Sequence, residues 1–198
     1  YQAEMFTDGG TIFANQAQLS AAGVPQVTVV HGSSTAGGAY MPGLSDYTVM
    51  VRKRAKVFLA GPPLLKAATG EVANDEDLGG AEMHSQVAGT SEFLAESDGD
   101  GIRIAREIVA SLDWNKNRPS FPPQLVTQPL YDTEELCGVV PVDYRKPVDS
   151  REVIARIIDG SDFLDFKTEY DTQTICGRAR IHGMPVGIIS NNNRMSVV

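Results

Sequence analysis

A glycine-rich stretch that directly follows a short apolar run constrains the fold of this chain more than any other feature. Residues 27–30 read VTVV, and β-branched residues of this kind are typical of a buried strand. Residues 31–43 read HGSSTAGGAYMPG, with small side chains at almost every position before Tyr40. A strand that turns through small residues into a helix is typical of α/β folds, and it leaves the main chain open to close approach.

Backbone amides at the beginning of a helix have no acceptor within the helix, and the helix dipole favours negative charge beside them. Such amides can stabilise an oxygen that becomes negative during a reaction. We therefore predict an oxyanion hole at the N–H groups of Gly37 and Gly38, with Ala39 as a neighbour able to share the role. The alternative is a tight turn whose glycines only let the strand and the helix pack, and the spacing alone does not separate the two.

Charge and composition exclude several classes of protein. The chain has 198 residues and a formal net charge of −8, which disfavours a general nucleic-acid surface because phosphate binding needs clustered Lys and Arg. No apolar run approaches the roughly 20 residues that a membrane helix needs, and the first residues lack the pattern of a signal peptide. We therefore expect no membrane span, and a location in the cytosol or in an organelle matrix.

Cysteine and histidine are too scattered to predict a metal site. Cys137 and Cys176 belong to no CxxC or Cys/His cluster, so we expect two buried free thiols. His31, His84 and His182 are also far apart, and a hydrogen-bonded structural role is favoured for each. His31 is the one that could also line a site, because it ends the strand beside the glycine-rich stretch.

The remaining pattern predicts alternating helices and strands, with glycine and proline at most of the boundaries. Helices are predicted at residues 8–22, 39–45, 64–68 and 101–112, and strands at residues 26–30, 47–51 and 56–60. In the last of these helices we expect Asp98 or Asp100 as the cap. Its apolar stripe is predicted at Ile102, Ala105, Ile108, Val109 and Leu112.

Two shorter features precede that helix. Asp75, Glu76 and Asp77 are adjacent carboxylates, and we interpret them as a solvated loop. Gly79 and Gly80 form a second glycine pair, and we predict a second turn of close approach there.

A polar, proline-rich stretch at residues 115–123 marks the main boundary of the chain. We predict a first domain at residues 1–117, a linker at 118–130 and the beginning of a second domain at 131–198. Residues 149–152 resemble a capping box that opens a helix at 153–159, which Gly160 would stop. Residues 174–181 and 184–190 alternate like the two strands of a hairpin.

Motifs for two common chemistries are absent from the glycine-rich stretch. Ser33, Ser34 and Thr35 are poor nucleophile candidates, because a nucleophile elbow needs Gly-x-Ser-x-Gly. The stretch is also not G-x-G-x-x-G, which disfavours a dinucleotide fold. Main-chain donors acting on a carbonyl remain, and a thioester suits them because its oxygen becomes negative when the adjoining carbon loses a proton.

A basic cluster follows the second predicted strand. Arg52, Lys53 and Arg54 stand together in an otherwise acidic chain. Such a cluster favours a phosphate-bearing ligand, although a solvated turn explains it equally simply.

Several long motifs carry a resemblance that extends over nearly the whole chain. TAGGAYMPGLSD at residues 35–46, VRKRAKVFLAGPPLLKAATGE at 51–71 and DLGGAEMH at 77–84 are similar to successive motifs of the carboxyltransferase β subunits of biotin-dependent acyl-CoA carboxylases. DSREVIARIIDGSDFLDFK at 149–167 and GRARIHGMPVGIISNN at 177–192 continue the resemblance in the family's order. Within the family, the methylcrotonyl-CoA and geranyl-CoA type is the most similar.

The resemblance implies an α/β fold of the crotonase-like (ClpP-like) type, a superhelix of βαβ units. The chain would cover part of an N-terminal carboxyltransferase domain and the beginning of a truncated C-terminal one. It also implies an enzyme of the ligase class, which transfers carboxylate from carboxybiotin to the enolate of an acyl-CoA. Biotin would be carried covalently by a biotin carboxylase/biotin carrier α subunit, and the β subunits would assemble with one another, as a hexamer in this family.

The resemblance also assigns roles to residues. Gly37 and Gly38 match the family's first oxyanion-hole motif and would hold the thioester enolate. Tyr40, Met41 and Gly43 lie just beyond it, where side-chain size would limit the acyl group. The expected substrate-binding residues are Thr35, Ala36, Tyr40, Met41 and Gly43. For the CoA phosphates we expect Arg52, Lys53, Arg54 and Lys66 from their charge alone, because no motif of the family assigns them this role.

Other members of the family remain open as alternatives. The substrate could be acetyl-, propionyl- or long-chain acyl-CoA, and a biotin-dependent decarboxylase subunit runs the chemistry in reverse. A crotonase-like module that only binds CoA is a further alternative, from a non-catalytic class. The family's second domain continues past Val198 and includes the glycine-rich hole for biotin, so we expect this length of chain to bind acyl-CoA without completing the transfer alone.

Overall fold

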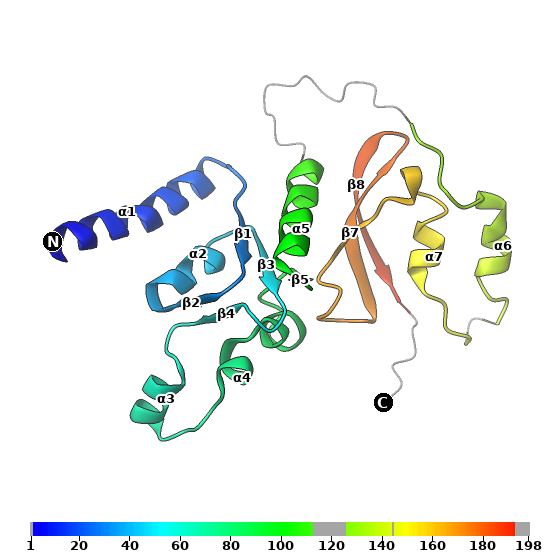
Figure 1. Cartoon of the computed structure of the whole chain (residues 1–198). Coiled ribbons are helices and arrows are strands. Elements are labelled where there is room, and N and C mark those ends of the chain that lie inside the picture. The colour runs from blue at the N-terminus through cyan, green and yellow to red at the C-terminus, as the bar shows by residue number, and fades with distance from the viewer. Residues whose placement is uncertain (1, 113–125, 144, 193–198) are drawn as a thin grey trace. The chain divides into compact units, whose positions relative to one another are not determined.

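The computed structural model describes residues 2–112, 126–143 and 145–192, and of residues 2–6 only the backbone. The chain divides into two compact units, Tyr1–Trp114 and Asn115–Val198, and Figure 1 shows the elements of each. None of the helices described combines the length and the apolarity that crossing a membrane requires. The described residues also contain no group of three or more His, Cys, Asp or Glu side chains that could hold a metal ion.

The first unit contains two small parallel sheets. One has the order β1-β3-β5 and the other pairs β2 with β4. Their bounds are Val27–Val30 for β1, Ser33–Thr35 for β2, Tyr47–Val51 for β3, Lys56–Phe58 for β4 and Phe93–Ala95 for β5. Parallel strands need crossover connections, which the intervening helices provide. The predicted strands at residues 26–30, 47–51 and 56–60 are confirmed to within two residues, as is the α/β order.

Helix α5 (Asp98–Ser111) packs against the larger sheet of this unit, and a core cluster of Val30, Met50, Ala55 and Ala81 lies outside that contact. Val49, Met50 and Val51 of β3 are buried on both faces of the sheet, as is usual for a central parallel strand. Helix α5 buries Gly101, Ile104 and Ile108 against it. A Cβ at Gly101 would lie 3.0 Å from the Val29 side chain, so glycine brings the helix axis close to the sheet.

Two expectations for α5 are wrong. Ile102 and Val109, which were assigned to the buried stripe, are 55% and 60% exposed. The helix instead turns Gly101 inward, and the buried positions then follow at 104 and 108. The cap is Ser97, whose hydroxyl accepts a hydrogen bond from the Asp100 amide at 3.2 Å, so neither Asp98 nor Asp100 is the cap.

The predicted helices around the first sheet are confirmed with changed ends. Helix α1 runs over Gln2–Ala21 and is followed by Gly23 at φ 70°, the conformation expected of a glycine stop. After β2, a 3-10 turn η1 (Ala36–Ala39) leads into the short helix α2 (Tyr40–Gly43), so helical structure begins three residues earlier than predicted. Helix α3 (Pro62–Thr69) ends at Gly70, at φ 79°.

The three adjacent carboxylates are helical, which corrects their assignment to a loop. They form the first turn of α4 (Asp75–Gly79), where the Asn74 side chain accepts from the Asp77 amide. Negative charge is favourable at a helix N-terminus, and Lys56 of β4 pairs with Asp75 and Glu76. A short π-helix η2 (Met83–Val87) follows.

The second unit is built on a three-stranded antiparallel sheet with the order β6-β7-β8. Its strands are β6 (Leu164–Phe166), β7 (Thr174–Ile181) and β8 (Met184–Asn191), and the predicted β7–β8 hairpin is confirmed. His182 and Gly183 form its turn at φ 51° and 76°, and the Asp159 carboxylate accepts hydrogen bonds from both of their amides.

The helices of this unit are short. They are η3 (Thr133–Glu135), α6 (Leu136–Val139), α7 (Ser150–Ile154) and η4 (Asp159–Ser161). Asp149 caps α7 as expected, by accepting from the Arg151 amide at 3.0 Å. The helix nevertheless ends at Ile154, so it lies earlier and is shorter than the predicted 153–159, and Gly160 at φ 61° stands in the next turn.

Most of the predicted linker falls outside the described residues, which resume at residue 126. The carbonyl of Thr127 accepts from the Gly160 amide at 3.3 Å, and the Leu130 amide donates to the Ser161 hydroxyl at 2.9 Å. The last residues of the predicted linker are therefore part of the second unit. Of the two cysteines, Cys137 is exposed, which corrects the expectation of a buried thiol, and Cys176 is half-buried.

Candidate functional site

The glycine-rich stretch forms a turn at the carboxyl end of β2. Thr35 ends the strand in an extended conformation, and Ala36 begins η1 at φ 51°. A positive φ is unfavourable for residues other than glycine. Sequence reasoning assigns such a conformation to glycine, but the structure assigns it to Ala36, while Gly37 and Gly38 have ordinary negative φ values.

Hydrogen bonds fix the direction of the peptide groups in this turn. The Tyr40 amide donates to the carbonyl of Gly37 and also approaches that of Gly38. Because N–H and C=O point in opposite directions in a trans peptide, the Gly38 amide points back toward the beginning of the turn. By the i→i+3 pattern of a 3-10 turn, the carbonyls of Thr35 and Ala36 accept from the Gly38 and Ala39 amides, and the Gly37 amide points the same way as that of Gly38 but has no acceptor within the turn. Ala39 itself is buried, at 8% exposure.

The space beside these amides is open in the described part of the chain. A Cβ added at Gly37 would have only Phe13 Cζ within 4 Å, at 3.8 Å, and one added at Gly38 would lie 3.4 Å from Ser34 Oγ. Nothing lies within 4 Å of a Cβ at Gly43. Packing within the described residues therefore does not require glycine at these positions.

Exposed apolar side chains surround the turn. Tyr40, Met41 and Leu44 of the α2 segment are 51%, 44% and 45% exposed, and the Tyr40 ring packs edge-on against Phe13 at 5.5 Å between centroids. The sequence had indicated Tyr40 and Met41. The structure adds Leu59, 63% exposed, because Thr35 pairs with Phe58 and the parallel strands β2 and β4 end at one edge of their sheet.

The two arginines of the basic cluster, Arg52 and Arg54, form ion pairs with carboxylates of this chain. Arg52 donates to Glu96 at 2.9 Å and to Glu82 at 3.2 Å, and Arg54 donates to Asp98 at 2.7 Å. Burial lowers the pKa of the Arg52 guanidinium, but the hydrogen bonds and charges of the two glutamates outweigh it and raise that pKa above its ordinary value. These pairs hold the end of β3 to the segments that follow, and binding of phosphate by Arg52 and Arg54 stays a prediction.

Lys53 and Lys66 differ from the two arginines. Both are exposed, and within the described residues neither forms an ion pair. Lys53 has φ 61° in the tight turn after β3, and Lys66 lies in the last turn of α3. These two lysines are the members of the predicted basic set that stay available to an anionic ligand.

Strand β4 is held firmly from the side opposite β2. His84 in η2 lies 2.7 Å from the Val57 carbonyl oxygen through Nε2, and 2.6 Å from the Thr90 hydroxyl through Nδ1. The Lys56 ammonium beside Asp75 holds the pKa of that carboxyl below its usual range. His84 therefore has the structural role predicted for it, whereas His31 and His182 are exposed.

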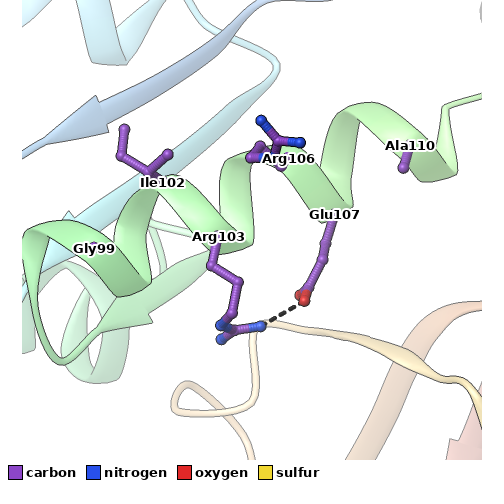
Figure 2. A pocket seen from close by; sticks show the side chains of 6 residues that line it. All are labelled: Gly99, Ile102, Arg103, Arg106, Glu107 and Ala110. Carbon is purple, nitrogen blue, oxygen red and sulfur yellow. Dashed lines mark hydrogen bonds and ion pairs between the residues drawn. The ribbon is translucent and has the colours of Figure 1, made fainter.

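A shallow hollow on the outer face of α5 is a second place where polar groups gather. Figure 2 shows Arg103 reaching toward Glu107, at 2.6 Å, and Asp100 accepts from the same guanidinium at 2.7 Å. The charge of Arg103 is thus already balanced within the helix. The hollow is lined by Gly99, Ile102, Arg103, Arg106, Glu107 and Ala110.

Comparison with known proteins gives the family of the chain. Residues 2–197 match the family described as carboxyl transferase domain. The probable biotin-dependent acyl-coenzyme A carboxylase beta2 subunit of Mycobacterium tuberculosis is 55% identical over 96% of this chain and 36% of its own length. The mitochondrial methylcrotonoyl-CoA carboxylase beta chain of Dictyostelium discoideum is 50% identical over 96% of this chain and 33% of its own.

Solved structures agree with these relatives. The β subunit of geranyl-CoA carboxylase from P. aeruginosa is 62% identical, with a TM-score of 0.54 over 97% of this chain and 36% of its own. The transcarboxylase 12S subunit, solved as a hexamer with hydrolysed methylmalonyl-coenzyme A bound, is 35% identical with a TM-score of 0.81 over 96% of this chain and 36% of its own. The predicted crotonase-like fold is confirmed.

The chain spans about a third of the length of the relatives it matches. The match nevertheless extends over nearly all of its own residues and both of its units. The chain belongs to the carboxyl transferase domain family.

Proposed function

We propose that this chain forms the acyl-CoA side of a carboxyltransferase in a biotin-dependent acyl-CoA carboxylase. The substrate would be a branched, α,β-unsaturated acyl-CoA of the methylcrotonyl-CoA or geranyl-CoA type. The observation that carries the proposal is the turn Ala36–Ala39, in which the Gly37 and Gly38 amides point to the beginning of the turn and that of Gly37 has no acceptor within it. The names of the relatives support the choice of reaction and of substrate class.

The amides of Gly37 and Gly38 would hold the thioester oxygen of the substrate. When the γ-carbon of the unsaturated acyl group loses a proton to biotin that has given up its carboxylate, the electron pair is delocalised through the double bond onto that oxygen, and two N–H donors would stabilise the dienolate charge. Removal of one such donor typically lowers kcat by about 10²- to 10³-fold. The γ-carbon would then form its bond to the carbon dioxide released when the N–C bond of carboxybiotin breaks. Ala39 is a weaker candidate than the sequence indicated, because it is buried and its amide points into the turn.

The exposed apolar side chains around the turn would contact the acyl chain. Tyr40 and Met41 lie on one side, and the open space at Gly43 would admit a longer chain. Thr35 and Ala36 would line the approach to the oxygen. For the CoA phosphates, Lys53 and Lys66 remain as candidates, because Arg52 and Arg54 are occupied by carboxylates of this chain.

Biotin would be brought by a partner protein of the biotin carboxylase and biotin carrier type. In its carboxylated form it supplies the carboxylate, and the residues assigned here act only on the acyl-CoA. We further propose a hexamer of the complete β subunits, as in the transcarboxylase 12S structure. The protein would work in the bacterial cytoplasm or, in a eukaryote, in the mitochondrial matrix.

The direct test is a carboxylation assay of the complete enzyme complex over a series of acyl-CoA substrates. The proposal expects the highest kcat/KM with methylcrotonyl-CoA or geranyl-CoA. A preference for acetyl-, propionyl- or straight long-chain acyl-CoA would overturn the substrate class and keep the reaction. Biotin-dependent decarboxylation without net carboxylation, or CoA binding without turnover, would overturn the reaction itself.

A further inference from the structure

We infer that Ser34 is a positioning residue for the reaction, acting through the turn that it precedes. This inference rests on the function proposed above, because it concerns the same amides. The side chain of Ser34 would not touch the substrate. It would hold the turn in the conformation in which the Gly37 and Gly38 amides point to the beginning of the turn.

The contact that carries the inference joins Ser34 to the last part of the turn. Its hydroxyl donates to the Gly38 carbonyl at 2.8 Å. This carbonyl belongs to the Gly38–Ala39 peptide, which follows both amides, so the bond ties the far end of the glycine pair to β2. Ser34 is half-buried, whereas its neighbours Ser33 and Thr35 on the same strand are exposed.

The strand that carries Ser34 is itself anchored. Ser34 pairs with Val57 in the parallel register of β2 and β4. The carbonyl of Val57 is in turn held by His84 Nε2 at 2.7 Å. The paired strand on one side and the hydrogen bond of the Ser34 hydroxyl on the other therefore define where the turn lies.

The Ser34 hydrogen bond is needed to keep the conformation of the turn, because the backbone is strained at the first residue of the turn. Ala36 has φ 51°, a conformation in which Cβ is close to the following carbonyl oxygen. Without an opposing contact the residue would rotate to negative φ, and the peptides of Gly37 and Gly38 would rotate with it. Backbone strain of this kind persists only where the surrounding contacts hold it, and the Ser34 hydroxyl is the side-chain contact that spans the turn.

The test is a set of variants of the complete β subunit, assayed for carboxylation in its complex. S34A should lower kcat by about 10-fold with little change in KM, since a net hydrogen bond is worth about that factor. S34T keeps the hydroxyl and should stay within about 3-fold of wild type by the same reasoning. S33A, on the exposed side of the same strand, is the matched control and should behave as wild type.

A double-mutant cycle with A36G separates positioning from direct contact. Glycine adopts both signs of φ with similar ease. In the A36G background, residue 36 should therefore keep its positive φ when the Ser34 hydrogen bond is lost. The loss caused by S34A should therefore shrink to about 2-fold in the A36G background, a non-additive result. An equal loss in both backgrounds would overturn the inference, and so would an S34A variant with wild-type kcat.

A structural readout does not depend on the reaction. In a crystal structure of the S34A variant, Ala36 is expected at negative φ with the Gly38 peptide rotated. Ala36 remaining near its present φ would overturn the inference, because the Ser34 hydrogen bond would then not be what keeps Ala36 at positive φ. If the wild-type complex carboxylates no acyl-CoA, the proposed function fails, and this readout still decides the role of Ser34.

Discussion

Two Gly-Gly pairs in the first unit have opposite surroundings. At Gly79 a Cβ would lie 2.8 Å from the Phe58 ring and closer still to the Val57 carbonyl oxygen, and at Gly80 it would lie 2.6 Å from the Glu76 carbonyl oxygen. At Gly37 the nearest atom would be 3.8 Å away. The second pair is glycine because the chain's own backbone fills the space, while the first pair has no such reason among the described residues.

The difference separates a structural role of glycine from a functional one. Both pairs belong to turns of close approach, as the sequence indicated, and the same strand β4 lies beside both. At Gly79 the approaching group is visible, namely the carbonyl of Val57 that His84 also binds. At Gly37 the approaching group would be a substrate. Each prediction below changes one side of this comparison.

The largest effect is expected for G79A. The added methyl group would overlap main-chain atoms of β4, which cannot move without breaking its pairing with β2. Overpacking against a rigid backbone should lower the free energy of unfolding by about 3 kcal/mol or more. Chemical denaturation of the complete subunit measures this, with G32A as the control because a Cβ there meets nothing within 4 Å. Equal stability of the two variants would contradict the claim that backbone atoms fill the space beside Gly79.

The next effect is expected for G37A, and it should appear in activity. A Cβ fits there, so the free energy of unfolding should change by less than about 1 kcal/mol. The methyl group would nevertheless occupy the space proposed for the substrate oxygen, and kcat should fall by about 10²-fold. Thermal unfolding and carboxylation assays of the same preparation check both. A stable variant with wild-type kcat would contradict a catalytic role of the glycine pair Gly37 and Gly38.

A smaller and selective effect is expected for G43F. The space at Gly43 is open, so phenylalanine should be accommodated and should shorten the region available to the acyl chain. Relative to wild type, kcat/KM should fall about 10-fold more for a long branched acyl-CoA than for a short one, the loss of one or two buried methylenes being worth that much. Parallel assays with the two substrates measure the ratio. Equal losses would remove Gly43 from the acyl-binding set.

The smallest effect concerns the ion pair of Lys56 and Asp75, which joins strand β4 to helix α4 beside Gly79 and Gly80. The pKa of Asp75 is lowered in the folded state, first by its hydrogen bond with Lys56. The pair therefore stabilises the fold above the ordinary carboxyl pKa of about 3.9, and this stabilisation is lost as the pH falls through the lowered value. K56Q should therefore lower the free energy of unfolding slightly at pH 7, where the pair contributes, and leave it unchanged at a pH below the lowered pKa of Asp75, which chemical denaturation at the two pH values measures. K66Q, on an exposed lysine, is the control.

Much of the fold of both units could be predicted from local patterns, and the exceptions have identifiable reasons. The run Val27–Val30 and the β7–β8 hairpin were predictable because β propensity and turn chemistry act over a few residues. The inward face of α5 was not, because Gly101 determines it by close packing and contributes no apolar side chain to the pattern.

The site shows the same limit. Gly37 and Gly38 could be identified from their spacing, but the strained residue is Ala36, a position that no glycine pattern marks. The ion pairs of Arg52 and Arg54 could not be predicted, because their carboxylate partners lie 30 to 44 residues away in the sequence. The role of Ser34 depends on the direction of one hydroxyl, which only the folded turn defines.

The central claim is that the Gly37 and Gly38 amides receive the thioester oxygen of an acyl-CoA. A structure of the complete complex with a bound acyl-CoA tests it most directly. The account predicts that oxygen at a hydrogen-bond distance of about 3 Å from one or both amide nitrogens, with the acyl chain along Tyr40 and Gly43. A thioester oxygen bound elsewhere, or the two amides occupied by carbonyls of the protein itself, would contradict it.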